Sequence, residues 1–264
     1  MQPLSAFPET DRRTVRGVFV DIDETLTTDG NLTAAAYAAL ERLHVAGKLC
    51  VPITGRPAGW CDHIARMWPV DAVVGENGAF YFRYDQAQNK LVKRFLLAPE
   101  ARAANRARLD EIGRRILAEV PGVAIASDQP YRDSDLAIDF REDVEPVPAE
   151  AVDRVVAIFE AEGATAKVSS IHVNGWIGTY DKLAMTRIML DECFGIELDA
   201  EKQHFVFVGD SPNDAPMFAY FPHAVGVANV RDFAPRMAAL PAYISAGKSG
   251  AGFAEIADFL LGAP

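Results

Sequence analysis

The stretch VRGVFVDIDETLT, residues 15–27, decides the fold class of this chain. Its first six residues are mostly apolar and β-branched, which is typical of a buried parallel strand. Two carboxylates, Asp21 and Asp23, follow directly where this strand would end. In open α/β sheets, ligands bind at the carboxyl ends of the strands. We therefore expect Asp21 and Asp23 to lie where a substrate can reach them.

The segments that follow this strand alternate between helix and strand patterns. Apolar residues at helical spacing predict a helix over 32–46, which Gly47 ends. A strand is predicted over 49–53, a helix over 57–67 and a strand over 71–74. This βαβαβ order predicts a doubly wound parallel α/β sheet, a Rossmann-like core.

A block with a different pattern interrupts this alternation. It predicts strands near 90–97, 123–127, 136–140 and 166–179, with helices over 99–119 and 148–162. Alternating elements then resume, with strands over 205–208 and 224–227 and helices up to 193, over 213–221 and near 252–261. We interpret residues 84–179 as an inserted α+β cap and residues 1–83 with 180–264 as the discontinuous core. The length of 264 residues suits this organisation.

Three further polar elements lie near the predicted core strands. Thr54 and Gly55 follow the strand over 49–53, where a hydroxyl and free backbone amides could hold an anion. Lys182 begins a helix after the cap, and Asp210 and Asp214 follow the strand over 205–208. Taken singly, each of these elements has another explanation. Thr54-Gly55 also fits a turn, Lys182 a surface lysine, and the Asp210–Asp214 segment a helix cap.

The four elements together favour a metal site. Asp21, Asp23, Asp210 and Asp214 would repel one another at one edge of a sheet unless a cation or protons offset their charge. Mg²⁺ prefers oxygen ligands and is normally held by a few carboxylates and by substrate phosphate oxygens. Lys182 would supply further positive charge. The sequence therefore predicts Mg²⁺ as the cofactor.

These four elements, in this order and spacing, resemble the four motifs of the haloacid dehalogenase superfamily of phosphatases, over the whole core. A cap inserted between the Thr54 and Lys182 motifs, with the stretch Asn77-Gly78-Ala79, resembles the type IIB branch. That branch includes Cof-type sugar phosphatases, sucrose-phosphate phosphatases and eukaryotic phosphomannomutases. Two residues depart from the family pattern: Glu24 stands where Gly is frequent, and Leu183 where Cof-type members commonly have Gly.

The resemblance implies a role for each reacting group. Asp21 would attack phosphorus and become an aspartyl phosphate. Asp23 would protonate the leaving oxygen and later activate water. Thr54, Gly55 and Lys182 would hold the phosphoryl oxygens.

The resemblance also implies the metal ligands. Asp210 would bind Mg²⁺ together with Asp21 and the backbone carbonyl of Asp23. Asp214 would complete or orient this shell. Asn213 would contact the phosphate or Lys182.

Specificity is expected from the cap, because a closing cap contacts the part of the substrate that the core cannot reach. The candidates are His172 and Asn174 on the returning strands, Arg132 in a turn of the cap, and Asn77. Polar residues there favour a sugar or polyol phosphate, by analogy with the family.

Three functions remain open at this point. The first is a Mg²⁺-dependent phosphomonoesterase acting on a small phosphorylated metabolite. The second is a sugar phosphomutase that uses the same phosphoenzyme on Asp21. The third is a regulatory module that binds phosphate without turnover, which would need neither the cap nor an acid at Asp23.

Charge and hydropathy limit the partners. The formal net charge is −11, which disfavours binding to nucleic acid and to anionic membranes. The sequence has no apolar run long enough to span a membrane, and its first fifteen residues read as a polar lead-in rather than a secretory signal. We therefore expect a cytoplasmic protein with a small-molecule substrate. The oligomeric state stays open.

Overall fold

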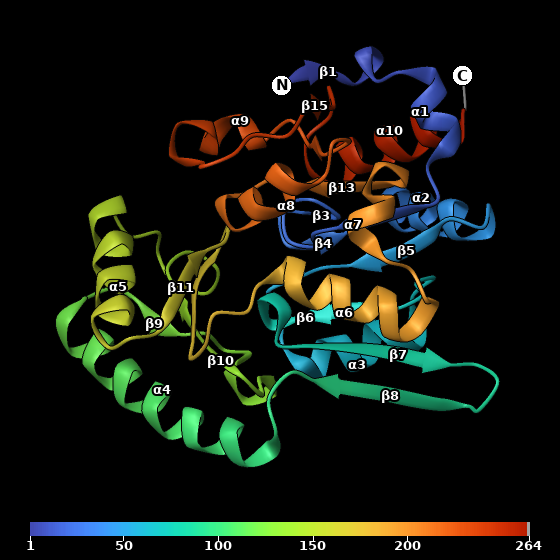
Figure 1. Ribbon diagram of the computed structural model, residues 1–264. Helices are drawn as coiled ribbons and strands as arrows, with labels where there is room; N and C mark the ends of the chain where they lie inside the picture. Colours follow the sequence, from blue (N-terminus) through green and yellow to red (C-terminus); the bar gives the residue numbers. More distant parts are fainter. Residues whose placement is uncertain (263–264) are drawn as a thin grey trace.

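The computed structural model describes residues 1–262 and is organised around a six-stranded parallel sheet (Figure 1). From one edge to the other the strands are β1 (Gln2–Pro3), β15 (Tyr243–Ile244), β14 (Val225–Gly226), β13 (Phe205–Gly209), β2 (Gly17–Val20) and β5 (Leu49–Pro52). Strand β2 thus lies inside the sheet, and its carboxyl end is flanked by those of β13 and β5.

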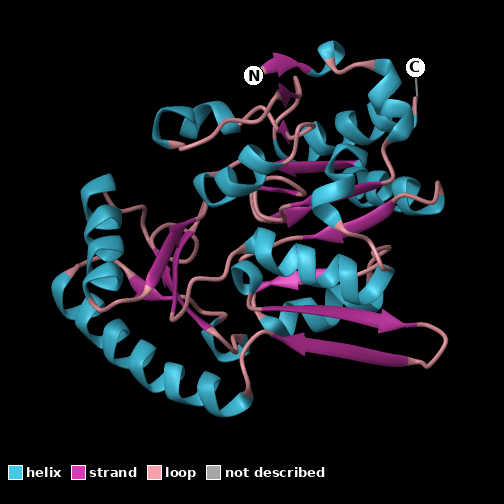
Figure 2. Ribbon diagram, viewed as in Figure 1, coloured by secondary structure: helices cyan, strands magenta, loops and turns pink. Residues whose placement is uncertain are grey.

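Helices cover both faces of this sheet, as the secondary-structure colouring in Figure 2 makes visible. Side chains of β2 alternate between two apolar clusters: Val18 lies in one and Phe19 in the other. The helices outside the cap are α1 (Glu9–Thr14), α2 (Ala34–Val45), α3 (Ala58–Met67), α6 (Lys182–Phe194), α7 (Leu198–Glu201), α8 (Ala215–Tyr220), α9 (Val230–Phe233) and α10 (Ser249–Leu261). Helices α2 and α10 pack with Val18, and α6 and α8 pack with Phe19. The predicted doubly wound α/β fold is confirmed.

The strand predicted over 90–97 extends the core. Antiparallel strands β6 (Val73–Gly75), β7 (Phe80–Asp85) and β8 (Lys90–Phe95) form one sheet, and a parallel bridge between Ile53 and Val74 joins it to the end of β5. Aromatic side chains of β7 are buried in the core cluster, and those of β8 pack against it. We therefore propose that the cap begins near residue 98, not at residue 84. The remaining predicted domain boundaries stay a prediction.

The cap consists of one sheet covered by two helices. Its antiparallel strands are β11 (Thr165–Val168), β12 (His172–Trp176), β10 (Asp135–Asp139) and β9 (Ala124–Ile125), in that order across the sheet. Helices α4 (Pro99–Glu119) and α5 (Ala149–Ala161) lie along one face of it (Figure 1). Leu136, Ile138 and Val173 pack against these helices. Because side chains alternate along a strand, Asp135, His172 and Asn174 point to the opposite face.

The N-terminal segment differs from the predicted lead-in. Strand β1 pairs with β15 at the edge of the core sheet, and Leu4 and Phe7 are buried in the core cluster. Sequence periodicity missed this segment because its strand is only two residues long. A short hairpin of β3 (Thr27–Thr28) and β4 (Asn31–Leu32) follows the Asp21 loop.

None of the helices within residues 1–262 has both the length and the apolar character needed to cross a bilayer.

Candidate active site

The residues predicted from four separate stretches meet at the carboxyl end of the core sheet. Asp21 follows β2, Thr54 follows β5, and Asp210 and Asp214 follow β13, so three adjacent strands deliver them. Lys182 is the first residue of α6, and its ammonium lies 2.9 Å from Oδ1 of Asp21 and 2.7 Å from Oδ1 of Asp214. The five side chains are buried. The sheet topology therefore brings the predicted core residues together.

Three of these carboxylates form a compact acidic group. Ligand oxygens of Asp21, Asp210 and Asp214 lie within 4.8 Å of one another. Burial raises the pKa of Asp21 to about 7, against the attraction of Lys182, and neighbouring carboxylates add to the rise. Burial and the charges of Asp214 and Asp21 likewise raise the pKa of Asp210 well above its usual range. One ammonium does not balance three buried carboxylates.

The oxygens of this group fit a hard divalent cation. Asp210 is oriented by two side chains, because its Oδ1 accepts from Thr25 at 3.1 Å and its Oδ2 accepts from Asn229 at 3.1 Å. Asp214 is held on both oxygens, with Oδ1 accepting from Lys182 and Oδ2 accepting from backbone amides of residues 210 and 211. These contacts favour Asp210 as a ligand and Asp214 as the group that orients the site.

Asp23 lies beside this group and is engaged by an arginine. Nε of Arg56 donates to both carboxylate oxygens of Asp23, at 2.9 and 3.1 Å, and Nη2 lies 2.8 Å from Oδ1. The side chain of Asp23 is 14% exposed, so it is more accessible than that of Asp21 at 5%. A partly accessible carboxyl beside the predicted nucleophile suits proton transfer to and from a substrate.

The predicted phosphate-binding residues line the adjoining surface. Thr54 is fully buried, and its hydroxyl accepts from the backbone amide of Arg56 at 3.0 Å. A Cβ added to Gly55 would lie only 3.1 Å from Nδ2 of Asn77. The lack of a side chain at Gly55 therefore lets the backbone after Thr54 approach the side-chain amide of Asn77. Nδ2 of Asn213 approaches Oδ1 of Asn77 at 3.5 Å. The buried Nδ2 of Asn77 has no hydrogen-bond partner among the described residues and could donate to a ligand.

The cap closes over these groups. His172 and Asn174 of the polar face line a small cavity together with Asp21, Asp23 and Asn213. Its volume is about 10 Å³, which is near the room that one water needs. Beside it, a cleft of about 620 Å³ is lined by residues of core and cap. A substrate of sugar size therefore requires the cap to move.

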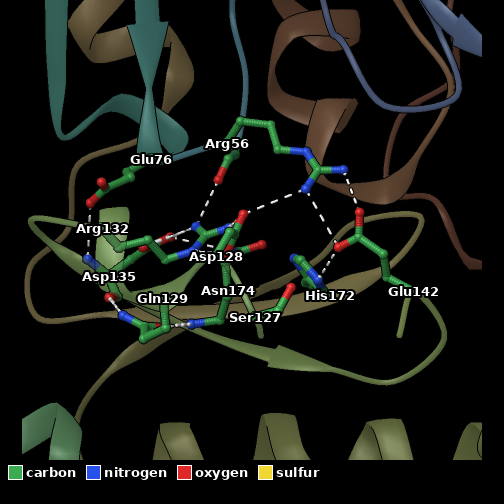
Figure 3. A network of polar contacts seen from close by, with 12 residues as sticks. Arg56, Glu76, Ser127, Asp128, Gln129, Arg132, Asp135, Glu142, His172 and Asn174 are labelled. Carbon is green, nitrogen blue, oxygen red and sulfur yellow. Dashed lines mark hydrogen bonds and ion pairs between the residues drawn. The ribbon is translucent and has the colours of Figure 1, made fainter. Parts of the chain in front are cut away.

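Arg132 lines the same cavity, but its side chain is already occupied (Figure 3). Nε and Nη2 donate to Asp128 at 2.9 and 3.0 Å, and Nη1 lies 3.1 Å from both oxygens of Asp135. Nη1 also donates to the backbone carbonyl of Gly55 at 2.9 Å. Arg132, predicted as a substrate-contacting residue, is thus engaged in joining the cap to the loop after β5.

A second charged residue joins cap and core from the other side. Glu76 is fully buried, and its carboxylate accepts from the backbone amide of Ala58 and from three successive cap amides, at residues 133, 134 and 135. Three consecutive donors around one carboxylate form an anion-binding nest. The backbone of Glu76 has a φ of 43°, which is unusual for a non-glycine residue.

The sequence did not single out four charged residues between core and cap: Arg56, Glu76, Asp128 and Glu142, of which Glu142 pairs with Arg56. Arg56 follows Thr54-Gly55 directly, and Glu76 precedes Asn77 directly. Their positions beside predicted site residues could therefore have marked both as candidates. Asp128 and Glu142 lie in cap loops without any local pattern. Only the folded chain brings them to the core.

Comparisons with known proteins agree with this architecture. The family model of haloacid dehalogenase-like hydrolases matches residues 18–108, whereas no curated protein matches the sequence. A solved structure from Thermoplasma acidophilum has a TM-score of 0.69 at 18% identity and covers 94% of this chain and 98% of that one. The sucrose-phosphatase of Synechocystis sp. PCC6803 has a TM-score of 0.62 at 14% identity. The match covers 93% of this chain and 98% of that one.

A third similar structure is a sugar phosphatase of haloacid dehalogenase subclass IIB, with a TM-score of 0.59 at 15% identity and coverage of 94% and 99%. Fold and site together define a Rossmann-like core whose acidic edge is closed by an α+β cap. Residues 18–108 of this chain thus match the haloacid dehalogenase-like hydrolases, and its core and cap share the fold of the subclass IIB sugar phosphatase. The recognition made from the four motifs is confirmed.

Proposed function

We propose that this protein is a Mg²⁺-dependent phosphomonoesterase that hydrolyses a small sugar or polyol phosphate through an aspartyl phosphate on Asp21. The observation that carries the proposal is the position of Lys182, whose ammonium joins Asp21 and Asp214 beside Asp210. Lys182 engages one oxygen of Asp21, and no described side chain or amide donates to the other. That second oxygen is the one we assign to the attack.

The reaction follows from the assigned groups. The free oxygen of Asp21 forms a bond to phosphorus as the bond to the leaving oxygen breaks, and Asp23 gives its proton to that oxygen. Water then attacks the phosphorus of the aspartyl phosphate and gives a proton to Asp23. The carboxylate of Asp21 and inorganic phosphate are released.

The remaining core residues would hold the phosphoryl group. The ammonium of Lys182 and the hydroxyl of Thr54 would bind its oxygens, and the amides of Gly55 and Asn213 would complete the contacts. Attraction by Asp21 and Asp214 outweighs the effect of burial and raises the pKa of Lys182, so this residue stays charged. Mg²⁺, held by Asp210, Asp21 and the backbone carbonyl of Asp23, would neutralise charge on the phosphoryl oxygens when bound.

The cap supports a polyhydroxylated leaving group. His172 and Asn174 present polar atoms to the cavity. Close to Gly55, which lines it, the buried amide nitrogen of Asn77 has no partner among the described residues. Such groups match sugar hydroxyls. Two similar structures are described as a sucrose-phosphatase and a sugar phosphatase, which supports the same substrate class here. The cytoplasmic location and the absence of nucleic-acid and membrane partners stay predictions from the sequence.

Phosphate release from a panel of sugar, polyol, nucleotide and acid phosphates tests this proposal. We expect release that requires Mg²⁺, favours sugar or polyol phosphates and is lost in Asp21→Asn. Equal release by the parent and by Asp21→Asn would refute the role of Asp21. Release confined to nucleotides would refute the substrate class.

A sugar phosphomutase would use the same phosphoenzyme. The observation that favours it is the cavity of about 10 Å³, which leaves little room for water beside a bound sugar. A sugar bisphosphate would then stimulate transfer between two positions of the sugar without net phosphate release. The same panel, analysed for isomerised sugar phosphates, distinguishes the two reactions.

A further inference from the structure

Arg56 occupies a position between the core site and the cap. It follows Thr54-Gly55 at the end of β5, and its side chain is 4% exposed. Its guanidinium lies 4.2 Å from the ring centroid of Trp60, a distance typical of a stacked cation and aromatic ring. The planar group is therefore fixed in orientation by Trp60 and offers its N–H donors to both sides.

The guanidinium joins the core carboxylate of Asp23 to cap carboxylates, of which Figure 3 shows Asp128, at 3.5 Å from Nη1, and Glu142. On the core side, Nε and Nη2 hold Asp23. On the cap side, Nη2 donates to Oε1 of Glu142 at 2.7 Å, and Nη1 lies 3.4 Å from Oε2. Nη2 is thus shared between the predicted acid/base residue and the cap.

Glu142 is itself held in place by the cap. Its backbone amide donates to Oδ1 of Asp139 at 2.8 Å, and its Oε2 lies 2.9 Å from Nε2 of His172. Although burial alone would raise the pKa of Glu142, His172 and Arg56 lower it to about 2. The cap thus presents a fixed carboxylate to Arg56 in the closed arrangement.

We propose that Arg56 is a positioning residue that orients Asp23 for proton transfer, and that Glu142 of the cap fixes Arg56 only when the cap covers the site. This inference rests on the proposed phosphatase activity. Cap closure would then both enclose the substrate and complete the acid/base group. An open cap removes Glu142 from Arg56 and leaves Asp23 less well oriented, which limits reaction before the substrate is enclosed.

The leaving group separates this role from a purely structural one. A sugar alkoxide needs the proton of Asp23 as its bond to phosphorus breaks, whereas p-nitrophenolate leaves without one. A residue that orients Asp23 therefore affects sugar phosphates more than p-nitrophenyl phosphate. A residue that only supports the fold or binds phosphate affects both substrates alike.

The experiment compares kcat and KM of the parent, Arg56→Gln, Arg56→Lys and Glu142→Gln on both substrates, with Glu145→Gln as control. Glu145 is an exposed cap carboxylate, with no ion pair among residues 1–262. We expect Arg56→Gln to lower kcat for the fastest sugar phosphate on the order of 100-fold, as misplacement of a catalytic group does. The loss on p-nitrophenyl phosphate should be at least about tenfold smaller. Arg56→Lys should recover part of the activity, and Glu145→Gln should match the parent.

Glu142→Gln provides a second test if the Arg56 variants fold poorly. The side chain of Glu142 is 27% exposed, so its substitution should disturb the fold less than that of Arg56. It should show the same leaving-group dependence with a smaller loss, and adding it to Arg56→Gln should cause little further loss. Equal losses on both substrates, or additive losses in the double variant, would overturn this inference while leaving the phosphatase proposal intact. No release by the parent from either substrate would overturn both.

Discussion

Two groups of buried charges lie a short distance apart, and they differ in how completely their charges are matched. At the core edge, three carboxylates face one ammonium, and the pKa of Asp21 rises to about 7 mainly through burial. In the network between cap and core, Glu142 contacts both Arg56 and His172, and its pKa falls to about 2 although burial opposes this. The core-edge group is suited to take up a cation and a phosphate, whereas the better-matched pairs of Glu142 hold the cap in place. Glu76 is the exception between cap and core, because burial and the charge of Asp135 raise its pKa to about 8.

This comparison predicts that residues of the core edge matter most for activity and that residues of the network matter most for stability. Substituting a member of each group, and measuring both properties each time, tests the distinction.

The largest effect is expected from Asp21→Asn. We expect phosphate release to fall at least about ten-thousandfold, as loss of a covalent nucleophile does in other enzymes. Stability should be unchanged or higher at neutral pH, since a buried carboxylate with a raised pKa is removed. Kinetic assays and urea unfolding of the same preparation measure both. A large loss of stability would mean that the core edge is itself a matched network.

Metal removal should act on the same group. We expect EDTA to abolish phosphate release and added Mg²⁺ to restore it. In Asp210→Asn the Mg²⁺ concentration for half-maximal activity should rise at least about tenfold, since the substitution weakens a proposed ligand. Titration of activity with Mg²⁺ gives this value, and Asp258→Asn, at a surface carboxylate paired with Arg42, is the control. An unchanged Mg²⁺ requirement in Asp210→Asn would contradict the assigned site.

Arg132→Met should affect stability. It removes one partner from two buried carboxylates, Asp128 and Asp135, and should lower the free energy of unfolding by about 3–5 kcal/mol. Arg114→Met is the matched control, because Arg114 pairs with Glu111 on an exposed helix face. This substitution should change the free energy of unfolding by less than about 1 kcal/mol. Urea unfolding measures both. Similar values for the two variants would show that the network does not stabilise the closed cap.

The smallest effect concerns pH. The pKa of Glu142 lies below the 4.5 that is usual for a glutamate, because of its ion pairs with His172 and Arg56. Its contribution to stability is therefore present above pH 4.5 and is lost as the pH falls toward 2. We expect the parent to melt at a higher temperature than Glu142→Gln at pH 7, and the difference to shrink below pH 4.5. Thermal melts over this range provide the measurement. A difference that grew as the pH fell would contradict the ion pairs of Glu142.

The contrast between the two groups also explains what the sequence could predict. Asp21, Thr54, Asp210 and Asp214 lie within a few residues of apolar core strands, so strand pattern and parallel topology bring them to one edge. Lys182 depends on a helix start after the cap, so only its charge and the resemblance to known motifs connected it to the others.

The network could not be predicted in this way. Asp128 and Glu142 contact Arg56 across 72 and 86 residues, and their loops carry no periodic pattern. Arg132 was predicted as a cap residue that contacts substrate, because the sequence does not reveal that its partners are Asp128 and Asp135. The boundary that we propose near residue 98, in place of 84, has a related cause: β8 has the alternating pattern of any exposed hairpin strand, and only its pairing with β7 joins it to the core.

The covalent role of Asp21 is the step on which the proposed reaction depends most directly. Acid-quenched parent protein, mixed with Mg²⁺ and the fastest sugar phosphate of the panel, can be digested and its peptides weighed by mass spectrometry. We expect the peptide containing Asp21 to gain the mass of one phosphoryl group and Asp21→Asn to show no such gain. A phosphoryl group on another residue, or its presence in Asp21→Asn, would rule out Asp21 as the nucleophile.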